Sequence, residues 1–272
     1  MVEIISYLCA LCIGLTLGLI GGGGSILTIP VLVYIMGVEP VLATAYSLFV
    51  VGVSALVGAI KNILLKNIHF EIGVFFAIPS LLAIYVTRST LVPAIPDIIY
   101  THPSFTLTKP LAIMVFFAII MLLASVSMIR SKKKDDDESS EENLFKSPHY
   151  LIIMLEGLVV GVITGIVGAG GGFLIIPALV LLSKIDIKKA IGTSLVIVTL
   201  KSLIGFFLGD AFTMEIDWGF LLVFTAIAIV GIFVGTFLNS LFDGRKLRIG
   251  FGYFILIMAG FIFYMEFIAS AT

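Results

Sequence analysis

Apolar residues along the chain fall into eight long stretches separated by short polar breaks. The stretches cover residues 4–36, 43–60, 70–87, 110–129, 150–182, 190–208, 218–238 and 249–269. A helix needs roughly 20 apolar residues to cross about 30 Å of hydrocarbon, and most of the stretches approach or exceed that length. Because lipid cannot satisfy open backbone groups, we predict an all-α polytopic membrane protein.

The composition agrees with this fold class and argues against others. Hydrophobic residues make up 60% of the 272 residues and charged residues 12%, whereas a soluble domain is roughly 45–50% apolar. The formal net charge of -1 gives no electrostatic reason to expect a nucleic-acid partner. The two cysteines, Cys9 and Cys12, lack the companions of a metal site, so we expect no metal and no cofactor.

Two of the stretches are too long for one ordinary crossing, and each contains a run of glycines. The first includes residues 21–25 (GGGGS), and the fifth includes residues 168–172 (GAGGG). Such runs interrupt a helix. The segments that follow would each rise roughly 16 Å at about 1.5 Å per residue, which is half a bilayer. We therefore predict that each long stretch is a re-entrant hairpin that turns at its glycines.

A charged linker at residues 131–148 divides the chain into two similar halves. It contains the run SKKKDDDESSEE, which cannot bury apolar surface. The division gives a first membrane repeat at 1–130 and a second at 149–272. Sliding the second half onto the first without a gap aligns Gly14 with Gly161, Gly18 with Gly165, Gly21 with Gly168, Pro30 with Pro177 and Ser47 with Ser194. This match predicts an internal repeat, and broken apolar segments at corresponding positions indicate a transporter binding site.

The distribution of lysine and arginine predicts the orientation. If both long stretches are hairpins, the basic residues near 61–66, 130–146, 184–189 and 245–248 all fall on one side of the membrane. The positive-inside rule assigns that side to the cytoplasm. Three full crossings and one hairpin per half then make the halves inverted repeats. The linker is expected inside the cell and both termini outside.

The glycine turns are the expected binding site. A turn inside the bilayer leaves backbone N–H groups that need an acceptor, and the half-helices beginning there direct positive dipole ends at the same region. Two such turns would hold one small anion near the midplane. The predicted substrate-binding residues are Gly22, Gly23, Gly24, Ser25, Ser47, Gly170, Gly171, Gly172, Thr193, Ser194 and Lys201. The alternative is that the glycines only allow close helix packing.

Two ionisable residues inside the stretches add to this site. Lys201 follows Ser194 by seven residues, which places both side chains on one helix face. A lysine inside a span supplies a counter-charge for an anion, unless its stem lets the ammonium reach the membrane surface. Glu156 lies one or two turns into its hairpin and is the candidate for carrying a coupling proton, with an interfacial carboxylate as the alternative.

The same motifs carry a family resemblance. Residues 18–30 (GLIGGGGSILTIP) with 43–47 (ATAYS), and residues 165–177 (GIVGAGGGFLIIP) with 190–194 (AIGTS), resemble the TauE/SafE sulfite exporter family over nearly the whole chain. The resemblance implies a transporter of sulfite, sulfoacetate or other organosulfonates in the cytoplasmic membrane. Export is the expected direction, and alternating access would come from one half moving against the other about the shared site.

Taken together, the residues and the resemblance predict a membrane exporter of small sulfur-containing anions, with protons as the candidate coupling ion. An anion channel, or a carrier of another small anion, is the alternative. No arrangement of serine, aspartate or metal ligands in the spans suggests an enzyme. The expected partners are an inorganic or organosulfonate anion, the lipid bilayer and, as an open alternative, a second copy of the chain in a homodimer.

Overall fold

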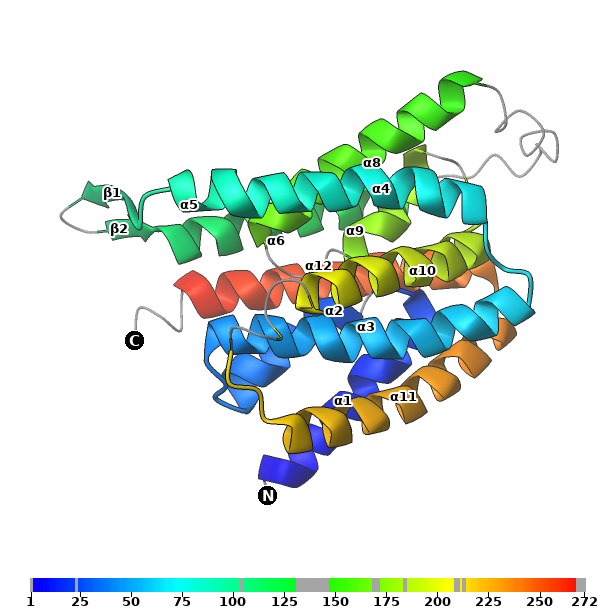
Figure 1. Ribbon diagram of the computed structural model, residues 1–272, viewed down its shortest axis with the longest axis horizontal. Helices are drawn as coiled ribbons and strands as arrows, with labels where there is room; N and C mark the ends of the chain where they lie inside the picture. Colours follow the sequence, from blue (N-terminus) through cyan, green and yellow to red (C-terminus); the bar gives the residue numbers. More distant parts are fainter. Residues whose placement is uncertain are drawn as a thin grey trace.

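The computed structural model describes residues 2–22, 24–102, 105–130, 147–167, 172–182, 185–207, 211 and 214–267. Most of the predicted linker, residues 131–146, lies outside these ranges. The described chain is helical apart from loops and one β-hairpin (Figure 1). Its α-helices are α1 Val2–Ile20, α2 Gly24–Pro30, α3 Pro40–Leu64, α4 Phe70–Val86, α5 Val92–Ala94, α6 Lys109–Arg130, α8 Ser147–Val167, α9 Gly172–Pro177, α10 Ile187–Gly205, α11 Trp218–Leu241 and α12 Gly244–Phe267. Strands β1 Ile98–His102 and β2 Phe105–Thr108 pair antiparallel.

Five helices are long and apolar enough to cross a membrane, which supports a multi-pass membrane protein. Their apolar parts are Leu42–Leu64, Phe70–Leu91, Leu111–Arg130, Trp218–Leu241 and Arg245–Met265. Shorter apolar helices cover Ile5–Ile20, Ile26–Ile35 and Tyr150–Ile166. The remaining long helix, α10, has 19 residues and carries Lys188, Lys189 and Lys201. These helices run along the long axis of the molecule (Figure 1).

The helix breaks occur where the glycine runs predict them. The first run separates α1 from α2, and the second separates α8 from α9. Each short helix ends on a proline, Pro30 or Pro177, and continues as a π-helical turn, η1 Val31–Ile35 or η3 Ala178–Leu182. A third π-helical turn, η2 Thr87–Leu91, follows α4. Because proline lacks an N–H and crowds the carbonyl one turn earlier, it disrupts the regular α-helical ladder at this point.

Each long helix has its main partner in the other half of the chain. The principal pairs are α1 with α11, α4 with α8, α3 with α10 and α6 with α12, and the short helices α2 and α9 also contact each other. When the second half is matched to the first, α1 matches α8 and α4 matches α11. The pair α1–α11 therefore has its counterpart in the pair α8–α4. In each of the other pairs, the two helices match each other.

Glycines bring the backbones of two of these pairs into direct contact. A side chain on Gly14 of α1 would collide with the carbonyl oxygen of Ala228 on α11. On α8, a Cβ at Gly161 would lie 2.5 Å from the carbonyl oxygen of Ser80 on α4. Gly14 and Gly161 are aligned in the two halves, and small residues at such crossings are typical of tight packing in lipid. Any larger residue must therefore push these helices apart.

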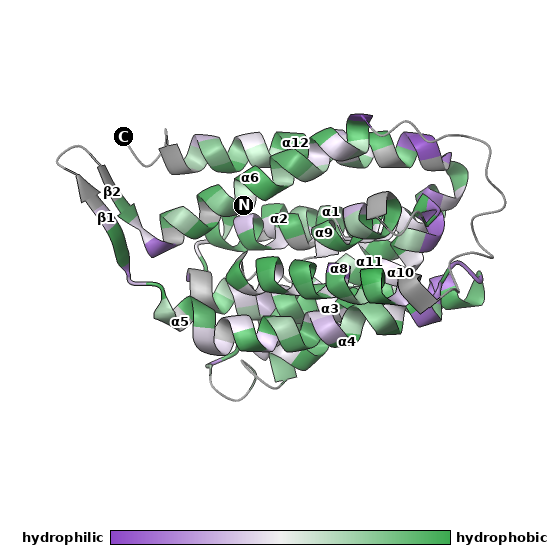
Figure 2. Ribbon diagram, turned by 90° about the horizontal axis from the view of Figure 1, so that it is seen from above, coloured by the Kyte–Doolittle hydropathy of each residue, from purple (hydrophilic) through white to green (hydrophobic). Residues whose placement is uncertain are grey.

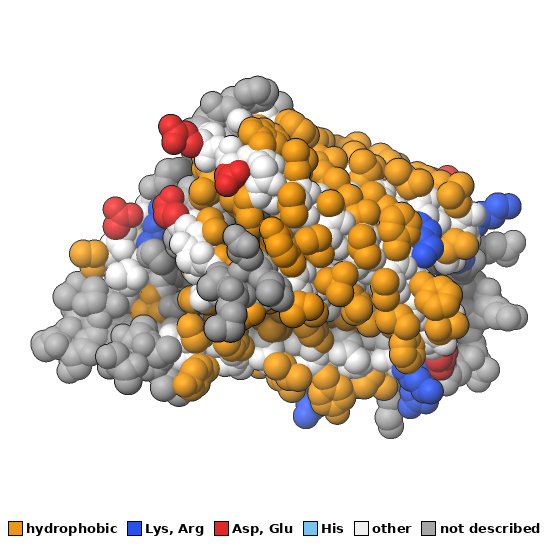
Figure 3. Space-filling view, turned by 90° about the horizontal axis from the view of Figure 1, so that it is seen from below, with side chains coloured by type: hydrophobic (Ala, Val, Ile, Leu, Met, Phe, Trp, Pro, Cys, Tyr) orange, Lys and Arg blue, Asp and Glu red, His pale blue; other side chains and the backbone are white. Residues whose placement is uncertain are grey.

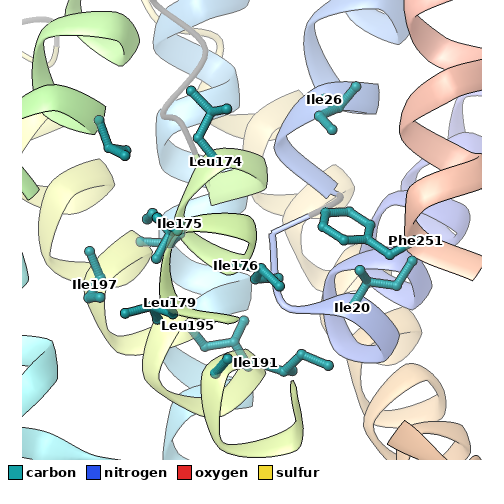
Figure 4. Packing of buried hydrophobic residues seen from close by; sticks show 14 of the residues in the cluster. Ile20, Ile26, Leu174, Ile175, Ile176, Leu179, Ile191, Leu195, Ile197 and Phe251 are labelled. Atoms are coloured by element: carbon teal, nitrogen blue, oxygen red, sulfur yellow. The ribbon is translucent and has the colours of Figure 1, made fainter. Parts of the chain in front are cut away.

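The short helices lie in the interior of the bundle. Seen from above, α2 and α9 lie between the pair α6–α12 and the layer that contains α3, α4 and α10 (Figure 2). Leu174, Ile175 and Ile176 of α9 are buried in the same apolar cluster as Ile191 and Leu195 of α10 (Figure 4). The short helices are thus enclosed by protein, as irregular backbone at membrane depth requires of its surroundings.

Charged side chains gather at the two ends of the bundle, with apolar side chains between them (Figure 3). Acidic Glu39 and Asp217 precede α3 and α11, whereas basic Lys66 and Arg245 follow α3 and begin α12. The Tyr46 hydroxyl accepts a hydrogen bond from the backbone N–H of Asp217 at 2.9 Å, so α3 and α11 start at the same end. The basic end is the one that the positive-inside rule assigns to the cytoplasm, and this orientation stays a prediction.

Candidate functional site

The first glycine turn lies against α10. Gly21 has a φ of 78°, a left-handed conformation that favours glycine, and its N–H donates to the Leu17 carbonyl at 2.6 Å. A Cβ on Gly21 would lie 2.7 Å from the Ser194 hydroxyl oxygen and 2.9 Å from the Ile191 carbonyl oxygen. Both the conformation and the space require glycine, so the chain turns in close contact with Ser194.

The second glycine run meets the first. A Cβ on Gly172, the first residue of α9, would lie 3.2 Å from the Cα of Gly22 and 2.9 Å from the side chain of Val198. Gly24, the first residue of α2, is also buried. Gly23, Gly170, Gly171 and the side chain of Ser25 lie outside the described part of the chain. Within that part, the two predicted turns come together at Gly22 and Gly172.

One face of α10 passes both turns. Ile191 and Ser194 border the first turn, Val198 borders the second, and Lys201 follows one helical turn later. Residues with these spacings share a face of an α-helix. The helix therefore places Ser194 and Lys201 on the same face, as their spacing predicts, and this face lies beside the glycine turns.

Lys201 is buried inside the protein, with 4% of its surface exposed. Its Nζ donates to the Thr164 hydroxyl on α8 at 3.4 Å, and that hydroxyl donates to the Gly161 carbonyl at 3.2 Å. Among the described residues, no carboxylate lies within ion-pair distance of Lys201. A charge taken out of water costs several kcal/mol unless it is paired. A single negative charge placed beside the Lys201 ammonium would therefore stabilise it.

Both predicted hydroxyls on α10 take part in hydrogen bonds, Ser194 as donor and Thr193 as acceptor. The Ser194 hydroxyl donates to the Ile191 carbonyl of its own helix at 2.8 Å. Thr193 accepts a hydrogen bond from the His69 backbone N–H at 3.0 Å, which ties α10 to the start of α4. The Ser194 hydroxyl lies beside Gly21, but it can donate to an anion only after its hydrogen bond to the Ile191 carbonyl breaks.

Ser47 lies at a different depth from Ser194. It is buried on α3 next to Leu48, whose side chain lies 3.7 Å from the Cβ position of Gly205 at the end of α10. Ser194 is about three turns earlier in α10, roughly 16 Å by helical rise. The structure therefore does not bring the two serines to one point.

Glu156 lies on the same helix face as Thr164. It is 6% exposed and precedes Thr164 by eight residues in α8, roughly 12 Å by helical rise. The proton-coupling candidate is thus a buried carboxylate on the face of α8 that leads to Lys201.

Several polar residues near this region were not predicted as site residues. The hydroxyls of Ser54, Ser80 and Ser202 are buried, and no hydrogen-bond partner for them occurs in the described ranges of the chain. Asn239 of α11 donates from its Nδ2 to the Leu19 carbonyl at 2.6 Å, just before the first glycine turn. Only Ser54 carried a sequence signal, because it occupies the position that matches Lys201 in the aligned halves.

No metal centre is evident in the described part of the chain. No group of three or more His, Cys, Asp or Glu residues that could hold a metal occurs there. A cavity of about 180 Å³ lies between β1, α6 and the end of α8, and Lys109 is the charged residue among its otherwise apolar lining. It is distinct from the α10 face beside the glycine turns.

Comparisons with known proteins match nearly the whole chain. Residues 6–262 match the family model described as Sulfite exporter TauE/SafE. A probable membrane transporter protein of Xylella fastidiosa is 27% identical over 92% of this chain and 90% of its own length. Probable membrane transporter proteins of Methanocaldococcus jannaschii and Bacillus subtilis are each 26% identical, covering 71% and 74% of this chain and 67% and 77% of their own lengths. No solved structure matches.

Proposed function

The chain belongs to the TauE/SafE sulfite exporter family of membrane transporters, and from that premise we propose that it exports small sulfur-containing anions such as sulfite or organosulfonates. The observation that carries the proposal is Lys201, a buried lysine whose polar partner among the described residues is the hydroxyl of Thr164. An oxyanion beside the glycine turns would supply the missing negative charge. It would also accept hydrogen bonds from turn N–H groups and lie at the positive ends of the helices that start there.

The helix pairs support two inverted repeats. An inverted duplication places matching helices around a pseudo-twofold axis, so each interface recurs or is its own counterpart. The pairs α1–α11 and α8–α4 are related in this way, and the aligned glycines Gly14 and Gly161 lie at their crossings. The contacts between α3 and α10 follow the same relation. Gly58 of α3 faces Leu195 of α10, and the matching residues, Gly205 of α10 and Leu48 of α3, face each other as well.

This packing defines the bodies that would move in alternating access. A simple motion of one half against the other would have to break the glycine-mediated interfaces α1–α11 and α8–α4. We propose instead that α1 moves with α11 and α8 moves with α4, so each body contains helices from both halves. The shared surface between the bodies is the α3–α10 interface, where leucine side chains mediate the contact.

Glu156 is the proposed carrier of a coupling proton. A buried carboxylate can be neutral when the transporter faces one side and ionised when it faces the other. Its place on the α8 face that leads to Thr164 and Lys201 would let its charge affect the anion site. The proposal makes transport dependent on a pH gradient.

The test is transport of sulfite, sulfoacetate, thiosulfate and sulfate by purified protein in liposomes, with and without a pH gradient. We expect saturable transport of at least one sulfur oxyanion, and we expect Lys201→Ala to abolish it. Lys61→Ala is the matched control, because Lys61 is a half-buried lysine on α3 that donates to the Thr236 hydroxyl of α11 at 2.7 Å. Equal flux in wild type and Lys201→Ala would refute the proposed counter-charge.

An anion channel is the alternative that the same experiment separates. A channel would give flux that does not saturate and does not respond to the pH gradient. The broken, enclosed helices α2 and α9 favour a carrier, because discontinuous helices at repeat interfaces are typical of secondary transporters.

A further inference from the structure

Three buried serine hydroxyls lack the partner that such hydroxyls usually have. Ser54, Ser80 and Ser202 lie on α3, α4 and α10 and are at most 1% exposed, yet none has a hydrogen-bond partner among the described residues. A serine in a membrane helix commonly donates to a carbonyl of the preceding turn, as Ser194 does to Ile191. An unpaired buried hydroxyl is unfavourable. Three of them in one protein interior indicate a partner that arrives from outside.

Contacts between α3 and α10 place Ser54 at the depth of Lys201. The Cβ position of Gly52 lies 2.9 Å from the side chain of Leu203, and that of Gly58 lies 3.1 Å from Leu195. The two helices therefore run antiparallel. Ser54 lies between Gly52 and Gly58, so it is opposite the stretch of α10 between residues 195 and 203, where Lys201 lies.

Contacts of α4 place Ser80 at a similar depth. Gly73 of α4 lies beside Thr193 of α10, with 3.4 Å from its Cβ position to the threonine methyl. Both helices run in the same direction from there, and Ser80 is seven residues further along α4. The backbone of Ser80 also touches Gly161, whose carbonyl accepts from the Thr164 hydroxyl that Lys201 contacts. Ser202 is the direct neighbour of Lys201 in α10.

We propose that Ser54, Ser80 and Ser202 are hydrogen-bond donors to the transported anion, in one polar layer with Lys201. The second glycine turn is one helical turn away, since Gly172 contacts Val198. Three hydroxyls and one ammonium suit a sulfur oxyanion with several acceptor oxygens, whereas a halide offers a single atom. This inference rests on the proposed function and assigns its specificity to residues outside the glycine motifs.

The proposal predicts opposite effects on stability and on affinity, which a structural serine would not show. Removing an unpaired buried hydroxyl leaves the empty protein as stable as wild type or more stable. The same change removes a donor to an anion, which raises KM roughly tenfold. The variants are Ser54→Ala, Ser80→Ala and Ser202→Ala. Thr225→Val is the control, because the buried Thr225 hydroxyl already donates to the Leu221 carbonyl at 2.6 Å.

The experiment measures sulfite transport in liposomes and thermal unfolding of the purified full-length protein with sulfite or chloride. We expect each serine variant to unfold at or above the wild-type temperature without sulfite, to gain less from added sulfite, and to have a raised KM. Thr225→Val should keep the wild-type KM. If wild type transports a sulfur oxyanion and the serine variants match it in KM, the inference is wrong while the proposed function stands. If wild type transports no sulfur oxyanion, both fail.

Discussion

Gly161→Ala tests the crossing of α8 and α4, where a single added methyl would meet backbone atoms. The added Cβ would lie 2.5 Å from the Ser80 carbonyl oxygen, 2.7 Å from the Ala83 Cβ and 2.8 Å from the Ser80 Cα. Backbone atoms cannot rotate away as a flexible side chain would, so α8 and α4 must separate. Overpacking of this kind costs about 1–3 kcal/mol, and the better helix propensity of alanine returns up to about 1 kcal/mol. We expect a net loss of about 2 kcal/mol, or roughly 4–8 °C in Tm for a chain of this size.

The assay is thermal unfolding of the detergent-purified protein, followed by the loss of its monodisperse fraction. Gly260→Ala on α12 is the matched control, because nothing lies within 4 Å of the Cβ position of Gly260, which is exposed. That variant should unfold at the wild-type temperature or slightly above it. A Gly161→Ala protein as stable as Gly260→Ala would refute the α8–α4 backbone contact and the helix pairing built on it.

Three further changes test other parts of the structure. Asn239→Leu leaves the Leu19 carbonyl at the end of α1 without its hydrogen bond, and it should destabilise the protein by about 1–2 kcal/mol and lower Tm by a few degrees. Asn62→Leu should cost less in the same unfolding assay, because the Asn62 amide donates to the Gly58 carbonyl of its own helix at 2.9 Å. Gly21→Ala forces a side chain into a left-handed conformation against α10, and sulfite transport should fall at least tenfold while the protein remains monodisperse. If the basic end is cytoplasmic, Lys66→Cys should react with a membrane-impermeant maleimide only in inside-out vesicles, and Glu39→Cys only in intact cells; the reverse pattern would invert the topology.

The sequence predicted the local features that depend on residue chemistry. Glycine runs break a helix wherever they occur, so the ends of α1 and α8 could be located from residues 21–25 and 168–172 alone. The prolines at 30 and 177 likewise mark where the short helices leave regular α geometry. Period and composition were sufficient because each of these effects lies within one or two turns of the residue that causes it.

The features that the sequence could not predict depend on which helices become neighbours. Ser47 and Ser194 match in the aligned halves, but α3 and α10 run antiparallel, which separates the two serines along the membrane normal. Ser80 and Ser202 resemble ordinary small residues of apolar helices until their depth and missing partners are known. Residues at matching positions of the two halves have matching surroundings, but they need not lie close to each other.

The helix pairing makes a prediction about motion that separates two mechanisms. Phe75 of α4 and Tyr150 of α8 lie within one proposed body, with ring centroids 4.5 Å apart. Phe49 of α3 and Phe206, the residue that follows α10, lie across the proposed boundary between bodies, with ring centroids 5.1 Å apart. Replacing each pair by two cysteines, in a background without Cys9 and Cys12, allows each contact to be locked by a bis-methanethiosulfonate cross-linker, which a reductant releases.

We expect the lock across α3 and α10 to stop sulfite transport until a reductant is added, because that interface must slide for the site to change sides. The lock between α4 and α8 should leave transport largely intact, because those helices move together. If the two sequence halves were instead the moving bodies, α4 and α8 would belong to different bodies and both locks would stop transport. Transport that survives the α3–α10 lock would contradict the boundary proposed here, since the site could then change sides with that interface fixed.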